Sequence, residues 1–247
     1  MLARLRDRLR TCLVPVLVSA VCAGVSPASM GAAMLAPEPN AVPTDWQFDV
    51  EVGPLRVVNL RMGNGSRQAF YYLTYQVVND TGKDLFFAPL IELATDQGEV
   101  MLAGRGVPLD ATFEIIDRQR NILLEDPIRV LGRLQQGEEN ARDGIAIWPV
   151  GKTDIDSVQV YLMGFSGETK AVRTRDAATG DPKVVTLWKT LMLRHAVRGD
   201  LLNSDAFSEG GRALERTQAR WILRKPEAIV TTTVQTGTTS PDGRTSP

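Results

Sequence analysis

The chain has 247 residues, of which 43% are hydrophobic and 23% are charged, the balance of a globular protein with an ordinary core. This length is enough for one large or two small domains. The formal net charge is −1, and residues 37–247 alone carry 24 basic and 28 acidic residues, a net charge of −4. A mildly acidic chain excludes the strong basic field expected of a protein that binds nucleic acid or an anionic membrane surface.

The N-terminal segment predicts export. Residues 1–10 are rich in arginine, residues 12–25 are apolar, and small residues follow. This order is typical of a secretory signal peptide, which we place at residues 1–28, with cleavage after Ala28. The apolar run is short for a membrane span, which needs ~20 residues. We therefore expect a secreted or periplasmic protein without a stable span after processing, and an uncleaved N-terminal anchor is the alternative.

Both cysteines of the chain, Cys12 and Cys22, lie in this segment. A lipidated Cys22 is disfavoured, because Val21 stands where a small residue should precede it. Once the segment is removed, no thiol remains. The mature chain then has no disulfide, no sulfur-ligated metal and no cysteine nucleophile.

Prolines at positions 37, 39 and 43 predict an extended linker over residues 29–45. Strict alternation over Trp46–Val52 predicts a strand with one wet face, which Gly53 and Pro54 end. A second strand is expected over Leu55–Met62, followed by a turn.

The stretch from Ala69 to Gly98 is the strongest β-pattern of the chain. Its first run places Tyr71, Leu73, Tyr75 and Val77 on one face, and its second run does the same with Leu85, Phe87, Ile91 and Leu93. The polar turn Asn79–Asp84 between them predicts a central β-hairpin. Tyr72 and Phe86 fall on the less apolar face, so we expect them to be exposed together as a contact surface for a protein or cell-surface partner.

The remaining elements are predicted in chain order. Leu109, Phe113 and Ile116 have helical spacing, so we expect a short helix capped by Asp110 and covering one end of the fold. Further strands are expected over the following ranges: Ile128–Leu134, Ile145–Trp148, Val158–Phe165, the edge strand Lys170–Arg175, Val184–Val197 and Ala219–Arg224. Residues 226–247 are rich in Thr, Gly, Ser and Pro and predict a disordered tail. Residues 46–225 are thus expected to form a single domain.

Three groups of residues are candidates for catalysis or metal binding. His195 is the one histidine of the chain, and a lone histidine on an apolar strand face is more often packed than catalytic. Asn79, Asp80 and Asp84 offer oxygens to calcium, but a turn explains the same residues. Carboxylates near Asp110, Asp117 and Glu138–Asp143 could serve a hydrolase only if the fold pairs them. The sequence therefore predicts no catalytic residue, metal site or cofactor.

The segment from Tyr71 to Gly98, with Val77-x-Asn79-x-Thr81-Gly82 followed by an Asp96-x-Gly98 turn, resembles the core of immunoglobulin-like domains in exported bacterial proteins. The resemblance implies an antiparallel immunoglobulin-like β-sandwich and carries no catalytic residue. The chain lacks the inter-sheet cysteines of antibody domains. The hypothesis is therefore an exported, non-enzymatic, envelope-associated module that binds a protein or a surface, and the alternative is a carboxylate-dependent hydrolase acting outside the cytoplasm.

Overall fold

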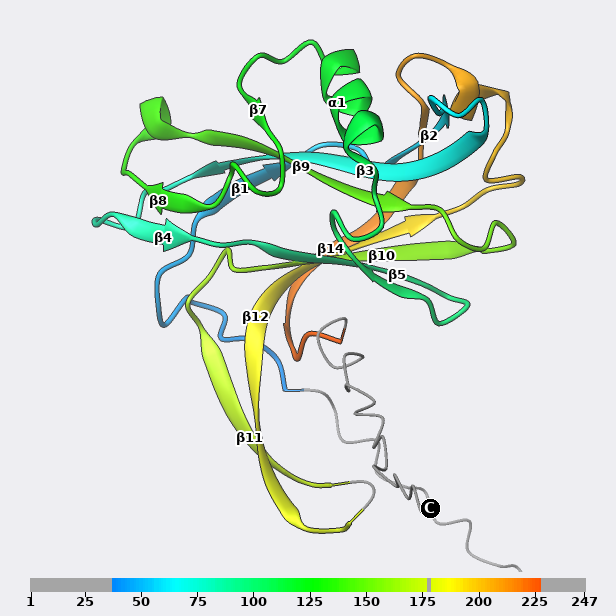
Figure 1. Cartoon of the computed structure of the whole chain (residues 1–247). Coiled ribbons are helices and arrows are strands. Elements are labelled where there is room, and N and C mark those ends of the chain that lie inside the picture. Colours follow the sequence, from blue (N-terminus) through cyan, green and yellow to red (C-terminus); the bar gives the residue numbers. More distant parts are fainter. Residues whose placement is uncertain (1–36, 177–178, 228–247) are drawn as a thin grey trace, which may run out of the picture. The chain divides into compact units, whose positions relative to one another are not determined.

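The computed structural model of the chain describes residues 37–176 and 179–227 (Figure 1). These residues form fourteen strands and one α-helix, which confirms the prediction of a mostly β chain with one short helix. The predicted signal peptide, residues 29–36 of the predicted linker and residues 228–247 of the predicted tail lie outside the described residues.

The first sheet is built around β3 (Arg67–Val78). Its other strands are β1 (Asp49–Val52), β2 (Arg56–Arg61), β7 (Leu124–Glu125), β9 (Arg142–Pro149) and β13 (Arg212–Ala213). β1 and β2 pair with the same edge of β3, one after the other. Gly53 and Pro54 lie between them and separate them into two strands. The other edge pairs with β9, and only β7 and β9 run parallel among the described strands of this sheet.

The second sheet is built around β12 (Pro182–Ala196), the longest described strand. Its other strands are β5 (Leu90–Thr95), β6 (Val100–Leu102), β10 (Ser157–Met163), β11 (Thr169–Arg175) and β14 (Glu215–Arg224). β14 pairs with one edge of β12, whereas β10 and β11 share the other edge. Two short strands, β4 (Leu85–Phe87) and β8 (Gly132–Leu134), pair separately.

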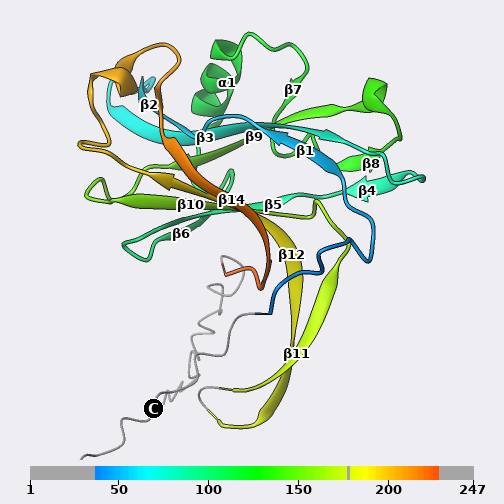
Figure 2. The same cartoon turned by 180° about the vertical axis from the view of Figure 1, so that it is seen from behind.

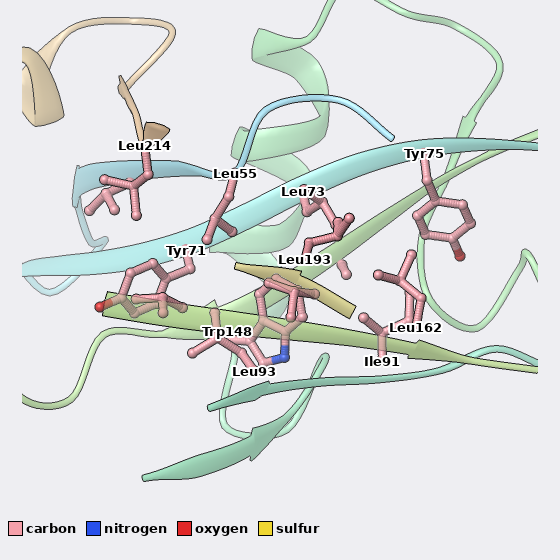
Figure 3. Close-up of a cluster of buried hydrophobic side chains, with 14 of the residues drawn as sticks. Leu55, Tyr71, Leu73, Tyr75, Ile91, Leu93, Trp148, Leu162, Leu193 and Leu214 are labelled. Atoms are coloured by element: carbon pink, nitrogen blue, oxygen red, sulfur yellow. The ribbon is translucent and has the colours of Figure 1, made fainter. Parts of the chain in front are cut away.

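The main core lies between the two sheets (Figure 3). Side chains alternate along a strand, so every second residue of β3, β9, β5, β10 and β12 points into it. The buried members drawn in Figure 3 include Tyr71, Leu73, Trp148, Leu93 and Leu193. The predicted inward face of the central stretch is therefore correct.

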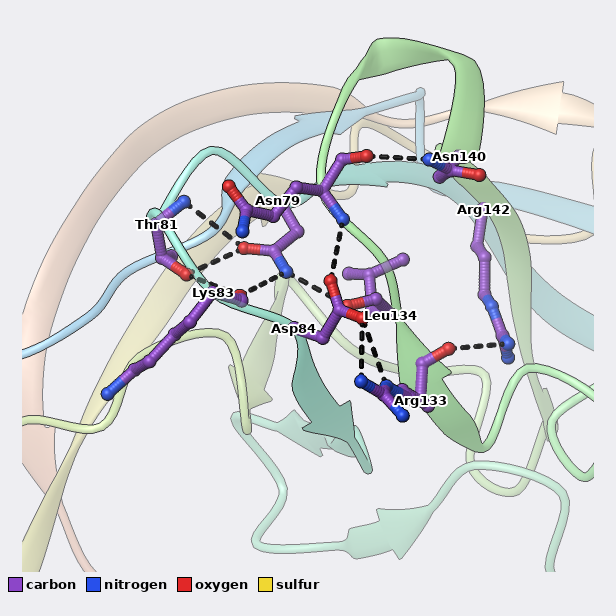
Figure 4. A network of polar contacts seen from close by, with 9 residues as sticks. Asn79, Thr81, Lys83, Asp84, Arg133, Leu134, Asn140 and Arg142 are labelled. Atoms are coloured by element: carbon purple, nitrogen blue, oxygen red, sulfur yellow. Dashed lines mark hydrogen bonds and ion pairs between the residues drawn. The ribbon is translucent and has the colours of Figure 1, made fainter.

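The pairing predicted for this stretch is wrong. β3 and β5 do not form a hairpin but lie in different sheets, so the polar turn Asn79–Asp84 carries the chain from one layer to the other. Asn79 is fully buried at this crossing (Figure 4). Its Nδ2 donates to the carbonyl oxygens of Lys83 and Leu134, both at 2.9 Å, and its Oδ1 accepts from Thr81. The polar residues that predicted a hairpin turn thus stabilise the connection between the two sheets instead.

The outer face of the first sheet is also buried. Helix α1 (Leu109–Arg118) lies across it and packs through Ala111, Thr112 and Ile115. This second core contains outward-facing residues of the sheet, namely Val58, Leu60, Phe70, Tyr72, Ile145 and Ile147. The expected helix is therefore present, but it covers a sheet face instead of an end. Pro108 occupies its N-cap position, and Asp110 lies in its first turn.

β11 and the N-terminal half of β12 form a two-stranded ribbon that projects from the two layers (Figures 1 and 2). The prediction of an edge strand at residues 170–175 is confirmed, since β11 ends the order of the second sheet. In the described part of the chain, no helix has the length and apolar character needed to cross a membrane.

Candidate functional site

Exposed apolar side chains concentrate around α1. Among the described residues, eleven large hydrophobic side chains are exposed, and six of them lie between Leu109 and Leu131. Three of the six flank one groove: Leu109 is 70% exposed, Phe113 57% and Ile128 76%. Contiguous exposed apolar surface of this kind is typical of an interaction site.

The groove runs between α1 and the segment Asp126–Arg129 and has a volume of about 440 Å³. One wall is formed by Val107, Leu109 and Phe113, and the opposite wall by Pro127 and Ile128. Further apolar lining comes from Ala103 and Ile147, and Thr112 contributes a hydroxyl group. A mostly apolar concave surface with few polar groups is suited to receive apolar side chains.

The wall opposite α1 is held in place by its own hydrogen bonds. The Oδ1 atom of Asp126 accepts from the backbone N–H groups of Ile128 at 2.8 Å and of Arg129 at 3.0 Å. Val130 is fully buried in the main core, and its carbonyl oxygen accepts from Arg142 at 2.9 Å. The exposed Ile128 therefore stands on a turn that hydrogen bonds hold in place.

The predicted contact surface of Tyr72 and Phe86 is wrong. Phe86 is 70% exposed, but Tyr72 is only 2% exposed, because α1 covers the face on which it lies. The Tyr72 hydroxyl donates to the Gly210 carbonyl at 2.7 Å, and burial raises its pKa. The two residues belong to different sheets, and the structure does not bring them together.

The carboxylates considered for hydrolysis do not gather at one place. Asp110 and Asp117 are on α1, whereas Glu138 and Asp143 line two adjoining depressions that share Glu51 and Gln76. Neither depression includes the two helix acids. Asp143 accepts hydrogen bonds from Gln76 at 2.9 Å and Asn121 at 2.7 Å, so its oxygens organise the local chain.

Two of the three side chains considered for calcium have their oxygens engaged within the fold. Asn79 Oδ1 accepts from Thr81, and Asp84 accepts from Arg133 and from the backbone N–H of Gln136 (Figure 4). No group of three or more metal-ligating His, Cys, Asp or Glu side chains occurs among the residues that the structure covers.

His195 is packed inside the fold. It lies on β12 opposite Val158 of β10, and its side chain is fully buried. Neither ring nitrogen has a hydrogen-bond partner among the described residues. Burial, and then the nearby Arg216 guanidinium, lower its pKa to about 4. The interpretation of His195 as a packed residue is supported by this arrangement.

We expect His195 to make stability depend on pH. Its pKa is about 4 in the folded chain and about 6.5 in an unfolded one. Between these values only the unfolded chain takes up the proton, so stability falls as the pH drops from 6.5 towards 4, by roughly 3 kcal/mol in total. Urea unfolding at pH 7.5 and pH 5 should show roughly 2 kcal/mol of this loss. His195→Leu should flatten this part of the profile, and an unchanged profile in that variant would contradict the assignment.

Comparison with protein-family models, curated proteins and solved structures finds no match to this chain.

Sequence reasoning missed the groove because it depends on which face of α1 is buried. Leu109, Phe113 and Ile116 form one apolar stripe, of which only Ile116 packs partly against the second core, and the buried stripe consists of Ala111, Thr112 and Ile115. The helical period shows both stripes but does not say which one meets the sheet. The two bulky side chains on the first stripe, Leu109 and Phe113, were the available signal, and both are exposed in the structure.

Proposed function

We propose that this protein is an exported, non-enzymatic binding module of the cell envelope, which holds an apolar segment of a partner protein in the groove beside α1. The observation that carries the proposal is the exposure of Leu109, Phe113 and Ile128 on both walls of one groove. Exposing these side chains to water is unfavourable unless a partner covers them.

Two further features support the proposal. The Arg-rich and then apolar N-terminal segment favours export. Two packed, largely antiparallel sheets are compatible with the immunoglobulin-like fold that the resemblance implies. The alternative of a carboxylate-dependent hydrolase has less support, since Asp110 and Asp117 lie on α1, outside the depressions lined by Glu138 and Asp143, and Asp143 already accepts from Gln76 and Asn121.

A photo-crosslinking amino acid placed at Phe113 tests the groove in the source cells. We expect a protein adduct in the exported fraction, identified by mass spectrometry. The same amino acid at Phe207, which is 48% exposed but lies outside the groove, is the matched control. Ile128→Ser should reduce the adduct formed from position 113, because it removes the opposite wall. Identical adducts from both positions, or none from position 113, would contradict the proposal.

A further inference from the structure

The ribbon of β11 and β12 offers two free edges that differ in character. The outer edge strand, β11, carries Lys170, Arg173 and Arg175, and charged side chains at an edge oppose the addition of another strand. On β12 the residues from Val184 to Trp188 carry no charge. Val184 is 63% exposed and Trp188 is 39% exposed. Only one edge of the ribbon is therefore protected.

The β12 edge is free because its neighbour ends early. β14 pairs with β12 only as far as Trp188, which lies opposite Arg224. Pro226 cannot donate to a ladder, and the next residue turns away, since the Glu227 N–H donates to Glu92 at 2.8 Å. On the N-terminal side of Trp188, β12 pairs with β11 alone among the described strands.

The bonding pattern of β12 identifies the groups on this edge. The Lys189 N–H donates to the Glu168 carbonyl on the β11 side. In an antiparallel strand, the N–H and C=O groups of successive residues point to opposite edges. Those of Leu187 and Val185 therefore point to β11, like those of Lys189, and those of Thr186 and Val184 point to the free edge. Both residues have strand geometry and offer a donor and an acceptor to an antiparallel partner.

We propose that a second copy of this chain occupies the edge, with residues 183–187 of the two copies paired antiparallel about a two-fold axis. Val185 then lies opposite its own counterpart, and Val184 lies opposite Thr186 of the other copy. Lys183 lies opposite Leu187, so no like charges are directly opposed. A strand without charges near the axis is suited to this self-pairing, whereas a charged foreign strand would leave its charges unpaired.

The charged edge limits the assembly to two copies. After pairing through β12, the outer strands of the two joined ribbons are the two β11 strands, each with three cations. A two-fold contact uses the same surface on both copies and closes on itself. The inference is therefore a dimer and not a fibre.

Proline substitutions on a single rung test the proposal. Thr186 and Ala171 lie opposite each other in the ribbon, and the N–H of each points away from the other strand, toward its own outer edge. Thr186→Pro removes a donor from the β12 edge of both copies, whereas Ala171→Pro changes only the β11 edge. In sedimentation velocity over a concentration series of the full-length chain, we expect Thr186→Pro to raise the dimer dissociation constant ~10-fold or more. Ala171→Pro should leave it unchanged.

Cysteine crosslinking tests the register. On a background with Cys12→Ser and Cys22→Ser, Val185→Cys should form a disulfide-linked dimer under mild oxidation, because opposed strand residues have the required spacing. Ala171→Cys should not. A chain that is monomeric at every concentration, a dimer that survives Thr186→Pro, or a monomer whose edge takes up a strand from a different protein would each overturn the proposal.

Discussion

We expect Phe87→Ala to destabilise the fold by about 3–5 kcal/mol. Phe87 is fully buried, and its ring meets the edges or faces of Phe48 and Phe165 at centroid distances of 5.7 and 5.1 Å. Truncation removes these contacts and leaves a cavity between the two layers. Urea or guanidinium unfolding of the variant measures the loss, which would be a large share of a typical stability of about 5–15 kcal/mol.

Phe86→Ala is the matched control, since Phe86 is the adjacent residue of β4 and is 70% exposed. Strand residues alternate between faces, so this substitution should cost much less. If Phe86→Ala proved the more damaging of the two, the inward face assigned to β4 would be incorrect.

Lys189→Met should also cost about 3–5 kcal/mol, because it removes one partner of a buried ion pair. Lys189 Nζ lies 2.8 Å from Glu168 Oε2, and both side chains are only 4% exposed. The Asn40 N–H donates to the other carboxylate oxygen at 2.9 Å. Burial alone raises the pKa of Glu168, but the hydrogen bonds from Lys189 and Asn40 and the Lys189 charge outweigh it and lower the pKa. The variant therefore leaves a charged carboxylate without its cation.

The double variant Lys189→Met with Glu168→Leu should recover most of this loss, because it removes both charges together. Arg120→Met, at an ion pair whose side chains are 79% and 67% exposed, should change the unfolding free energy little. All four chains can be compared by chemical denaturation. A double variant as unstable as Lys189→Met would show that the cost comes from packing and not from the unpaired charge.

The sequence predicted the strands and their inward faces better than their partners. Alternation at period 2 depends on the residues themselves, so Tyr71, Leu73 and Leu93 were placed correctly. The turn residues Asn79–Asp84 suit a hairpin and a crossing between sheets equally well. The crossing is distinguished from a hairpin by the hydrogen bond from Asn79 to Leu134, which is 55 residues away. The residues of the turn alone cannot predict this bond.

The outer face of β3 was predicted wrongly for a similar reason. The near-continuous apolar run Ala69–Leu73 belongs to a strand that is buried on both faces, but its alternating aromatic residues also fit a strand with one wet face. The cover comes from α1, which follows almost forty residues later. Exposure of Tyr72, and with it the candidate contact surface, therefore depended on a distant element.

The crossing at Asn79–Asp84 has a consequence for the order in which the chain acquires structure. β3 pairs with the preceding β1 and β2, and β5 pairs with the nearby β6, but the other edge of each waits for a later strand, β9 for β3 and β10 for β5. The two sheets are completed only by β13 and β14, near the C-terminal end of the described residues. Closing such long loops before their contacts form is entropically costly and slows folding. A chain emerging from its N-terminus can therefore form only these local pairs early, and both sheets are complete only when almost all of the described chain is available.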